Sequence, residues 1–139
     1  PHGATPLIIH WSPAEVSNFE TAYNSAKERH RENNWPFPRW FDFRRKVIVG
    51  APVVVRGALE TGLKAIAQAL HQHGLVETVW EEGPADGLGA MVGAWWCQKE
   101  AMRKGISIGE VNLMKEISQY NEVDCKVMME ITRYLRKHH

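Results

Sequence analysis

The chain has few cysteines, no long apolar run and no visible leader segment. Its two cysteines, Cys97 and Cys125, share no metal-ligand or redox spacing, so we expect reduced thiols in an intracellular setting. Apolar runs such as residues 47–49 and 53–55 are far shorter than the ~20 residues that a membrane-spanning helix needs. No basic segment followed by an apolar one opens the chain, so no signal peptide is expected.

The sequence also has no large excess of positive or negative charge. Lys and Arg number 17 against 16 Asp and Glu, which leaves a formal net charge of +1. A dedicated nucleic-acid binder normally carries a strong basic excess, so we expect no direct sequence-specific contact with nucleic acid. A nearly neutral molecule meets little repulsion from its own copies, which permits self-association. At 139 residues the chain is long enough for a single domain, residues 1–139, with a proper core.

What the sequence does contain is mainly helical signal. We predict a mainly α fold of five to seven helices in a compact bundle, with a short N-terminal β-hairpin that includes residues 7–9. Ser12 is a suitable N-cap for the first helix, Pro13 suits its first position, and Glu15 completes a capping box. Four residues form the predicted inner face of this helix: Val16, Phe19, Tyr23 and Ala26.

The rest of the chain shows further helical patterns and one long loop. The predicted helical segments are residues 40–49, residues 53–73, residues 91–104, a helix that a second capping box opens at Ser107 and Glu110, and a final segment from Asn121. Gly74 is predicted to end the helix at residues 53–73, and Gly105 is predicted to end the helix at residues 91–104. Residues 75–90 hold several glycines and a proline, and we predict a long exposed loop there.

No catalytic, metal or cofactor site is predicted. His71 and His73 lie two residues apart near a helix end, which places them on different faces of that helix. Cys97 follows two tryptophans and lacks the surroundings of a nucleophile, so we interpret it as a core residue. The glycines between residues 83 and 93 do not match a phosphate-binding loop. We therefore expect a protein that is not an enzyme.

Three separated segments together resemble the amino-terminal domain of retroviral (Gag-derived) capsid proteins. The first starts at Pro1 and reaches the Ser-Pro step of residues 12–13, with an aliphatic and an aromatic residue following as in helix 1 of that family. The second is Pro-Arg-Trp-Phe-Asp at residues 38–42, similar to a helix start of gammaretroviral capsids, with Val-Ile-Val-Gly-Ala-Pro at residues 47–52. The third, Ile-Ser-Ile-Gly-Glu-Val at residues 106–111, looks like the start of helix 7 in lentiviral capsids. Their order and approximate spacing agree with the family.

The resemblance implies a structural switch formed by Pro1 and Asp42. Capsid proteins of this kind begin at a proline that proteolytic maturation exposes, and its charged amine pairs with an aspartate at the start of helix 3. Asp42 stands at the matching position. A buried amine needs such a partner, because an unpaired buried charge costs several kcal/mol. The implied Pro1–Asp42 salt bridge would lock the hairpin after cleavage.

The resemblance also implies self-assembly. Such domains form hexameric and pentameric rings through helices 1 to 3, and the rings tile a shell, so the expected locations are the virion capsid and the host-cell cytoplasm. The matching ring contacts are Ala14, Asn18, Thr21, Arg44 and Arg45. Host factors bind an exposed loop in some relatives, and its counterpart includes Glu81, Glu82, Gly83 and Pro84. Ala14 stands where some lentiviral capsids carry a basic residue, and the carboxy-terminal capsid domain is absent from this sequence.

Two other classes of function stay open. One is a helical nucleic-acid-binding or regulatory domain, whose phosphate contacts would be Arg29, Arg31, Arg39, Arg44, Arg45 and Lys46. A steep fall of affinity with salt would support it, and the net charge of +1 argues against it. The other is an enzyme without a recognisable signature, which a substrate screen would reveal. A membrane partner is not expected.

Overall fold

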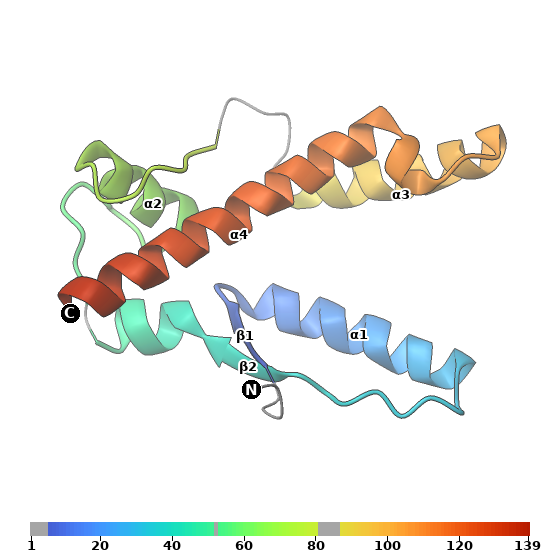
Figure 1. Cartoon of the computed structure of the whole chain (residues 1–139), viewed down its shortest axis with the longest axis horizontal. Coiled ribbons are helices and arrows are strands. Elements are labelled where there is room, and N and C mark those ends of the chain that lie inside the picture. Colours follow the sequence, from blue (N-terminus) through green and yellow to red (C-terminus); the bar gives the residue numbers. More distant parts are fainter. Residues whose placement is uncertain (1–5, 52, 81–86) are drawn as a thin grey trace. The chain divides into compact units, whose positions relative to one another are not determined.

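The computed structural model describes residues 6–51, 53–80 and 87–139, and these residues are mainly helical (Figure 1). In chain order the elements are β1 (Leu7–His10), α1 (Pro13–Arg29), β2 (Arg39–Asp42), the π-helix η1 (Arg44–Val49), α2 (Leu63–Gln72), α3 (Gly87–Lys104), the 3-10 turn η2 (Ile108–Glu110) and α4 (Asn112–His138). The predicted mainly α class is confirmed. The chain divides into two compact units, residues 1–66 and 67–139, and each is described by itself.

Helix α1 begins where its capping box predicts. The Ser12 hydroxyl accepts a hydrogen bond from the Ala14 amide at 3.2 Å, and the Glu15 carboxylate accepts one from the Ser12 amide at 3.1 Å. The predicted inner face is confirmed, because the four half-buried side chains of α1 are Val16, Phe19, Tyr23 and Ala26. The rest of α1 is exposed.

The β element at the front of the chain differs from the predicted hairpin. Strand β1 pairs in parallel with β2, with Leu7 opposite Arg39 and His10 opposite Asp42. Parallel neighbours need a crossover, which α1 and the extended segment after it supply. The hairpin prediction for β1 is therefore wrong, because its partner comes from residues that we expected to start a helix. Trp40 packs edge-on against Phe19 at 5.3 Å between ring centroids, and this contact docks α1 on the sheet.

Residues 53–62 are not helical, which corrects the first half of the predicted helix at 53–73. The β-branched residues at 53–55 favour extended backbone, and Gly57 adopts a φ of 95° that side-chain-bearing residues rarely reach. Leu59, in the middle of this stretch, is fully exposed. Helix α2 begins only at Leu63, and Gly74 follows its end with a φ of 68°, as predicted.

In the second unit, α3 and α4 pack together through small side chains of α3. A methyl group added at Gly93 would lie 3.2 Å from the Ile117 Cδ1 atom and 3.3 Å from the Leu113 Cδ2 atom, so glycine allows the two helices to approach closely. Cys97 is fully buried in the same contact, with Ala101 and Val111. The interpretation of Cys97 as a core residue is confirmed.

Helix α4 is continuous over residues 112–138, so the predicted break at Asn121 is wrong. Asn121 is exposed, and the buried stripe of Ile117, Val127, Ile131 and Leu135 continues past it. The second capping box is confirmed at Ser107 and Glu110, although it opens η2 rather than α4 itself.

The described part of the predicted loop is only partly exposed. Residues 87–90 belong to α3, which corrects the predicted end of the loop. We call residues 76–80 the docked segment, because hydrogen bonds tie it to α4. The Glu130 carboxylate accepts from the Glu77 amide at 2.8 Å and the Thr78 amide at 3.0 Å, and the Trp80 indole donates to Asp124 at 2.8 Å.

Candidate functional site

Three of the predicted assembly residues share one face of α1. Ala14, Asn18 and Thr21 recur at helical spacing, and all three are exposed. Ser17 and Ser25 extend this face over three turns and are exposed as well. We call these five residues the outer strip. Surface helices normally carry charged residues on the face that points to solvent, whereas every side chain here is small and uncharged.

The other two predicted assembly residues lie in η1, beside Asp42. The Arg44 guanidinium is exposed and donates from Nε to the Thr61 hydroxyl at 3.0 Å and to its carbonyl at 3.2 Å. The Arg45 amide donates to the Asp42 carboxylate at 2.8 Å, and its side chain is exposed. The structure thus brings Arg44, Arg45 and Asp42 into one turn, and it places the outer strip on a different element.

Asp42 already has a structural role at the start of η1, whereas Pro1 lies outside the described residues. The half-buried carboxylate caps this helix through the Arg45 amide, at the end of the sheet where His10 lies. The implied Pro1–Asp42 salt bridge stays a prediction.

Replacing Asp42 with Asn separates its observed hydrogen bond with the Arg45 amide from the predicted salt bridge with Pro1. The Asn side chain keeps an oxygen for the Arg45 amide but has no charge for the Pro1 amine. With Pro1 free, we expect Asp42→Asn to lower the free energy of unfolding by about 1.5–3 kcal/mol, the range for a hydrogen bond to a charged group. With one alanine added before Pro1, the same substitution should change little. Denaturant titrations of the four proteins measure both effects, and equal losses in both backgrounds would leave Asp42 as a helix cap only.

The predicted host-factor residues Glu81, Glu82, Gly83 and Pro84 lie outside the described residues. The docked segment leads directly to them in the sequence and is fastened to α4 by the hydrogen bonds of Glu130 and Asp124. Their assignment to a host-factor loop stays a prediction.

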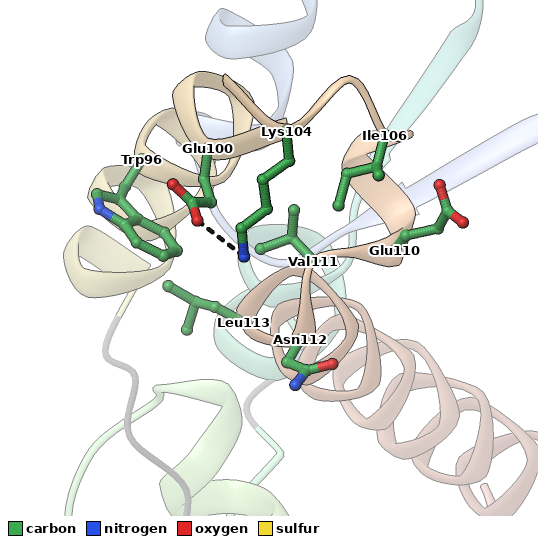
Figure 2. A pocket seen from close by; sticks show the side chains of 8 residues that line it. All are labelled: Trp96, Glu100, Lys104, Ile106, Glu110, Val111, Asn112 and Leu113. Atoms are coloured by element: carbon green, nitrogen blue, oxygen red, sulfur yellow. Dashed lines mark ion pairs between the residues drawn. The ribbon is translucent and has the colours of Figure 1, made fainter. Parts of the chain in front are cut away.

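The α3–α4 turn holds a pocket that the sequence did not indicate. Its volume is about 280 Å³, and Figure 2 shows the residues that line it: Trp96, Glu100, Lys104, Ile106, Glu110, Val111, Asn112 and Leu113. The Lys104 ammonium lies 2.9 Å from a Glu100 oxygen. The lining comes from α3, η2 and α4, so no short sequence motif could have revealed it.

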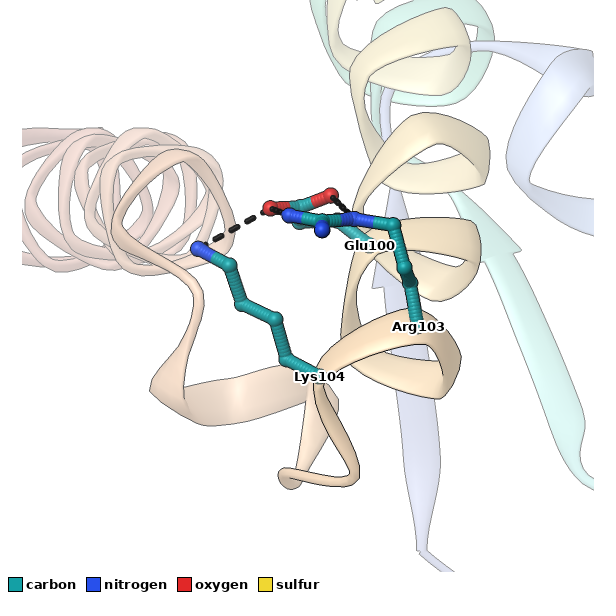
Figure 3. A network of polar contacts seen from close by, with 3 residues as sticks. All are labelled: Glu100, Arg103 and Lys104. Carbon is teal, nitrogen blue, oxygen red and sulfur yellow. Dashed lines mark hydrogen bonds and ion pairs between the residues drawn. The ribbon is translucent and has the colours of Figure 1, made fainter.

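Glu100 is held as a carboxylate by two neighbouring cations. Arg103 donates to it at 2.7 Å and Lys104 at 2.9 Å, and its side chain is only 15 % exposed. Figure 3 shows how the two cations converge on this carboxylate. Hydrogen bonds from Arg103 and then from Lys104 lower the pKa of Glu100 to about 2. The carboxylate therefore stays ionised and neutralised at ordinary pH, so it is unsuited to proton transfer near neutrality.

The other side chains that could bind a metal or act in catalysis do not cluster in the described part of the chain. Within residues 6–51, 53–80 and 87–139, no three His, Cys, Asp or Glu side chains are placed to hold a metal ion. His71 is exposed and its Nδ1 atom lies 3.1 Å from the Val76 carbonyl, while Cys125 is exposed on α4.

Comparison with known proteins does not identify a family for this chain. No family model, no curated protein and no solved structure matches it. The resemblance to retroviral capsid domains therefore stays a prediction that rests on the three sequence segments.

Proposed function

We propose that this chain is a structural self-assembly protein of the retroviral capsid type, whose copies form hexameric or pentameric rings through α1. The observation that carries the proposal is the outer strip, an exposed helix face over three turns without a charge or a large side chain. The three sequence segments that resemble capsid domains support the same function.

The outer strip suits close packing of one helix against another. Small side chains let helix axes approach to about 8 Å, the short end of the usual range. Ala and Ser lose little side-chain entropy when they are buried, and the absence of charge removes the largest desolvation cost. The net charge of +1 adds little repulsion between copies. Arg44 and Arg45, exposed on η1, are the proposed polar contacts of the ring.

A charge placed on the outer strip should prevent assembly. We expect Asn18→Lys to raise the protein concentration needed for assembly by at least about tenfold, because each ring would bring several like charges together. The matched control is Asn121→Lys, the same change at an exposed position of α4, and it should have little effect. Sedimentation velocity at rising protein concentration and electron microscopy of assemblies in high salt give the measurement.

Two outcomes would contradict the proposal. One is a native chain that remains monomeric up to millimolar concentration, both in high salt and with a crowding agent. The other is assembly of the Asn18→Lys protein at the same concentration as the Asn121→Lys protein. Circular dichroism of both variants shows whether α1 is still folded.

The second candidate function is nucleic-acid binding or regulation, because all six predicted phosphate contacts are exposed. Arg29 and Arg44 make internal hydrogen bonds, from their Nε atoms to Ser25 and Thr61. An oligonucleotide titration at several salt concentrations separates the two functions. Tight binding with a steep salt dependence, together with failure to assemble, would favour this candidate.

A further inference from the structure

The outward surface of α3 is apolar although it is exposed. Met91, Val92, Trp95 and Met102 are each between 57 % and 77 % exposed. At 100° per residue these four side chains, together with Lys99 and Arg103, fall within about one third of the helix circumference. We call these six residues the α3 outer face. A contiguous patch of exposed apolar side chains with polar residues at its edge is typical of a surface that binds a protein, a membrane or a ligand.

The three cations of α3, Lys99, Arg103 and Lys104, outnumber its one acid, Glu100, so the helix carries a net charge of +2 (three minus one). The Lys99 ammonium lies 3.7 Å from the centre of the Trp95 ring, so its stem runs along the apolar surface. Glu100 is the acidic residue of the α3 sequence, and Arg103 and Lys104 neutralise it. The α3 outer face therefore combines large apolar side chains with positive charge, and its complement is an apolar surface with negative charge.

We propose that the α3 outer face binds the surface of an anionic lipid bilayer. Trp side chains favour the boundary between lipid headgroups and acyl chains, and Lys stems bury their carbons there while the ammonium group stays among the headgroups. None of the helices in residues 6–51, 53–80 and 87–139 could span a bilayer. A helix with a large apolar face and cations beside it binds along the plane of the bilayer surface, and this is the orientation that we propose for α3. This departs from the expectation of no membrane partner, which considered only membrane-crossing segments.

Two observations favour a bilayer over a protein partner. A second copy would bring the cations of two such faces together, with no exposed acid on either α3 to pair with them. The large side chains also project from a single convex helix, which fits a deformable lipid surface without a matching groove. Binding would need no unfolding, because α4 already covers the opposite side of α3 at Gly93 and Cys97.

Vesicle co-sedimentation of the whole chain tests the proposal. We expect binding to vesicles of phosphatidylcholine with phosphatidylserine, much weaker binding to phosphatidylcholine alone, and a loss of binding at high salt. Lys99→Glu should weaken binding at least about tenfold, because it replaces an attraction by a repulsion, and Trp95→Ala should weaken it several-fold. The matched controls are Lys137→Glu, in the basic last turn of α4, and Trp35→Ala, an exposed Trp elsewhere, which should bind like the native chain.

Several outcomes would overturn the proposal. They are absence of binding to either kind of vesicle, equal binding to both kinds, and equal loss with Lys137→Glu and Lys99→Glu. Binding of an acidic amphipathic helical peptide at Trp95 without vesicle binding would show a protein partner instead. The Asn18→Lys variant should retain vesicle binding, so failure of the assembly proposal would leave this one standing.

Discussion

Replacing Trp11 with alanine should lower the free energy of unfolding by about 3–5 kcal/mol, the range for removal of a large buried aromatic side chain. Trp11 is 5 % exposed and its ring stacks on Phe43 at 5.7 Å between centroids. Its indole also donates to the Thr61 carbonyl at 3.0 Å, across 50 residues of sequence. The substitution would leave a cavity in the first unit, and the Thr61 carbonyl would keep only its hydrogen bond from Arg44. Denaturant titration followed by circular dichroism gives the free energy.

A second variant at position 11 separates packing from hydrogen bonding, and a variant at Trp35 serves as the control. Trp11→Phe keeps an aromatic ring but removes the indole donor, so we expect a loss of about 1–2 kcal/mol. Trp35→Ala removes a side chain that is 39 % exposed and should cost clearly less than Trp11→Ala. Equally small losses of unfolding free energy in Trp11→Ala and Trp35→Ala would contradict a stabilising contact between Trp11 and Thr61. Thr61 also accepts a hydrogen bond from Arg44, a proposed ring contact, so loss of Trp11 should weaken assembly as well.

Replacing Glu130 with alanine should cost about 1–3 kcal/mol, because its carboxylate accepts hydrogen bonds from two amides and a hydroxyl of the docked segment. Those donors would lose their partner, and the docked segment should exchange its amide hydrogens faster. The control is Glu122→Ala on the same helix, which removes only an exposed ion pair with Lys126 and should change little. Hydrogen exchange of the Glu77 and Thr78 amides checks the local effect, and equal exchange in both variants would contradict it.

The contribution of Glu130 should depend on pH in a defined direction. Burial raises the pKa of this carboxyl, but hydrogen bonds from the Thr78 hydroxyl and from the Thr78 and Glu77 amides outweigh it, and the net pKa is below its ordinary value of 4.5. A lowered pKa in the folded state gives stability that is complete above about pH 4.5 and is lost as the pH falls through the folded-state value. The difference in stability between the native chain and Glu130→Ala should therefore shrink in acid and stay constant from pH 6 to 8. A difference that grew in acid would contradict the assignment.

The ends of several helices were predictable from the sequence alone. Ser12 with Glu15 and Ser107 with Glu110 form capping boxes in the structure, and Gly74 and Gly105 take positive φ values after helix ends. Each of these signals acts between residues a few positions apart, so the local sequence is sufficient. The inner face of α1 was predictable for the same reason, because a helical repeat alone places Phe19 and Tyr23 together.

Other features depended on partners far away in the chain. Residues 39–42 are a strand because β1 supplies their hydrogen-bonding partner, although the local sequence also suits a helix start. The apolar spacing of residues 53–62 suits a helix, but this stretch is irregular in the structure. Within it, Thr61 accepts hydrogen bonds from the Trp11 indole and the Arg44 guanidinium. The intrinsic helix and strand preferences of single residues are small free energies, so tertiary contacts can override them.

The candidate sites divide in the same way. The sequence by itself determined the small, uncharged outer strip of α1 and the near neutrality of the chain, since both follow from residue type and helical repeat. Only the tertiary structure decided which side of α3 is buried. Gly93, Cys97 and Ala101 pack against α4 because their small size allows close approach, and this leaves the larger Met91, Trp95 and Met102 exposed. Hydrophobicity alone would have buried the larger side chains, so their exposure follows from the shape of the helix contact.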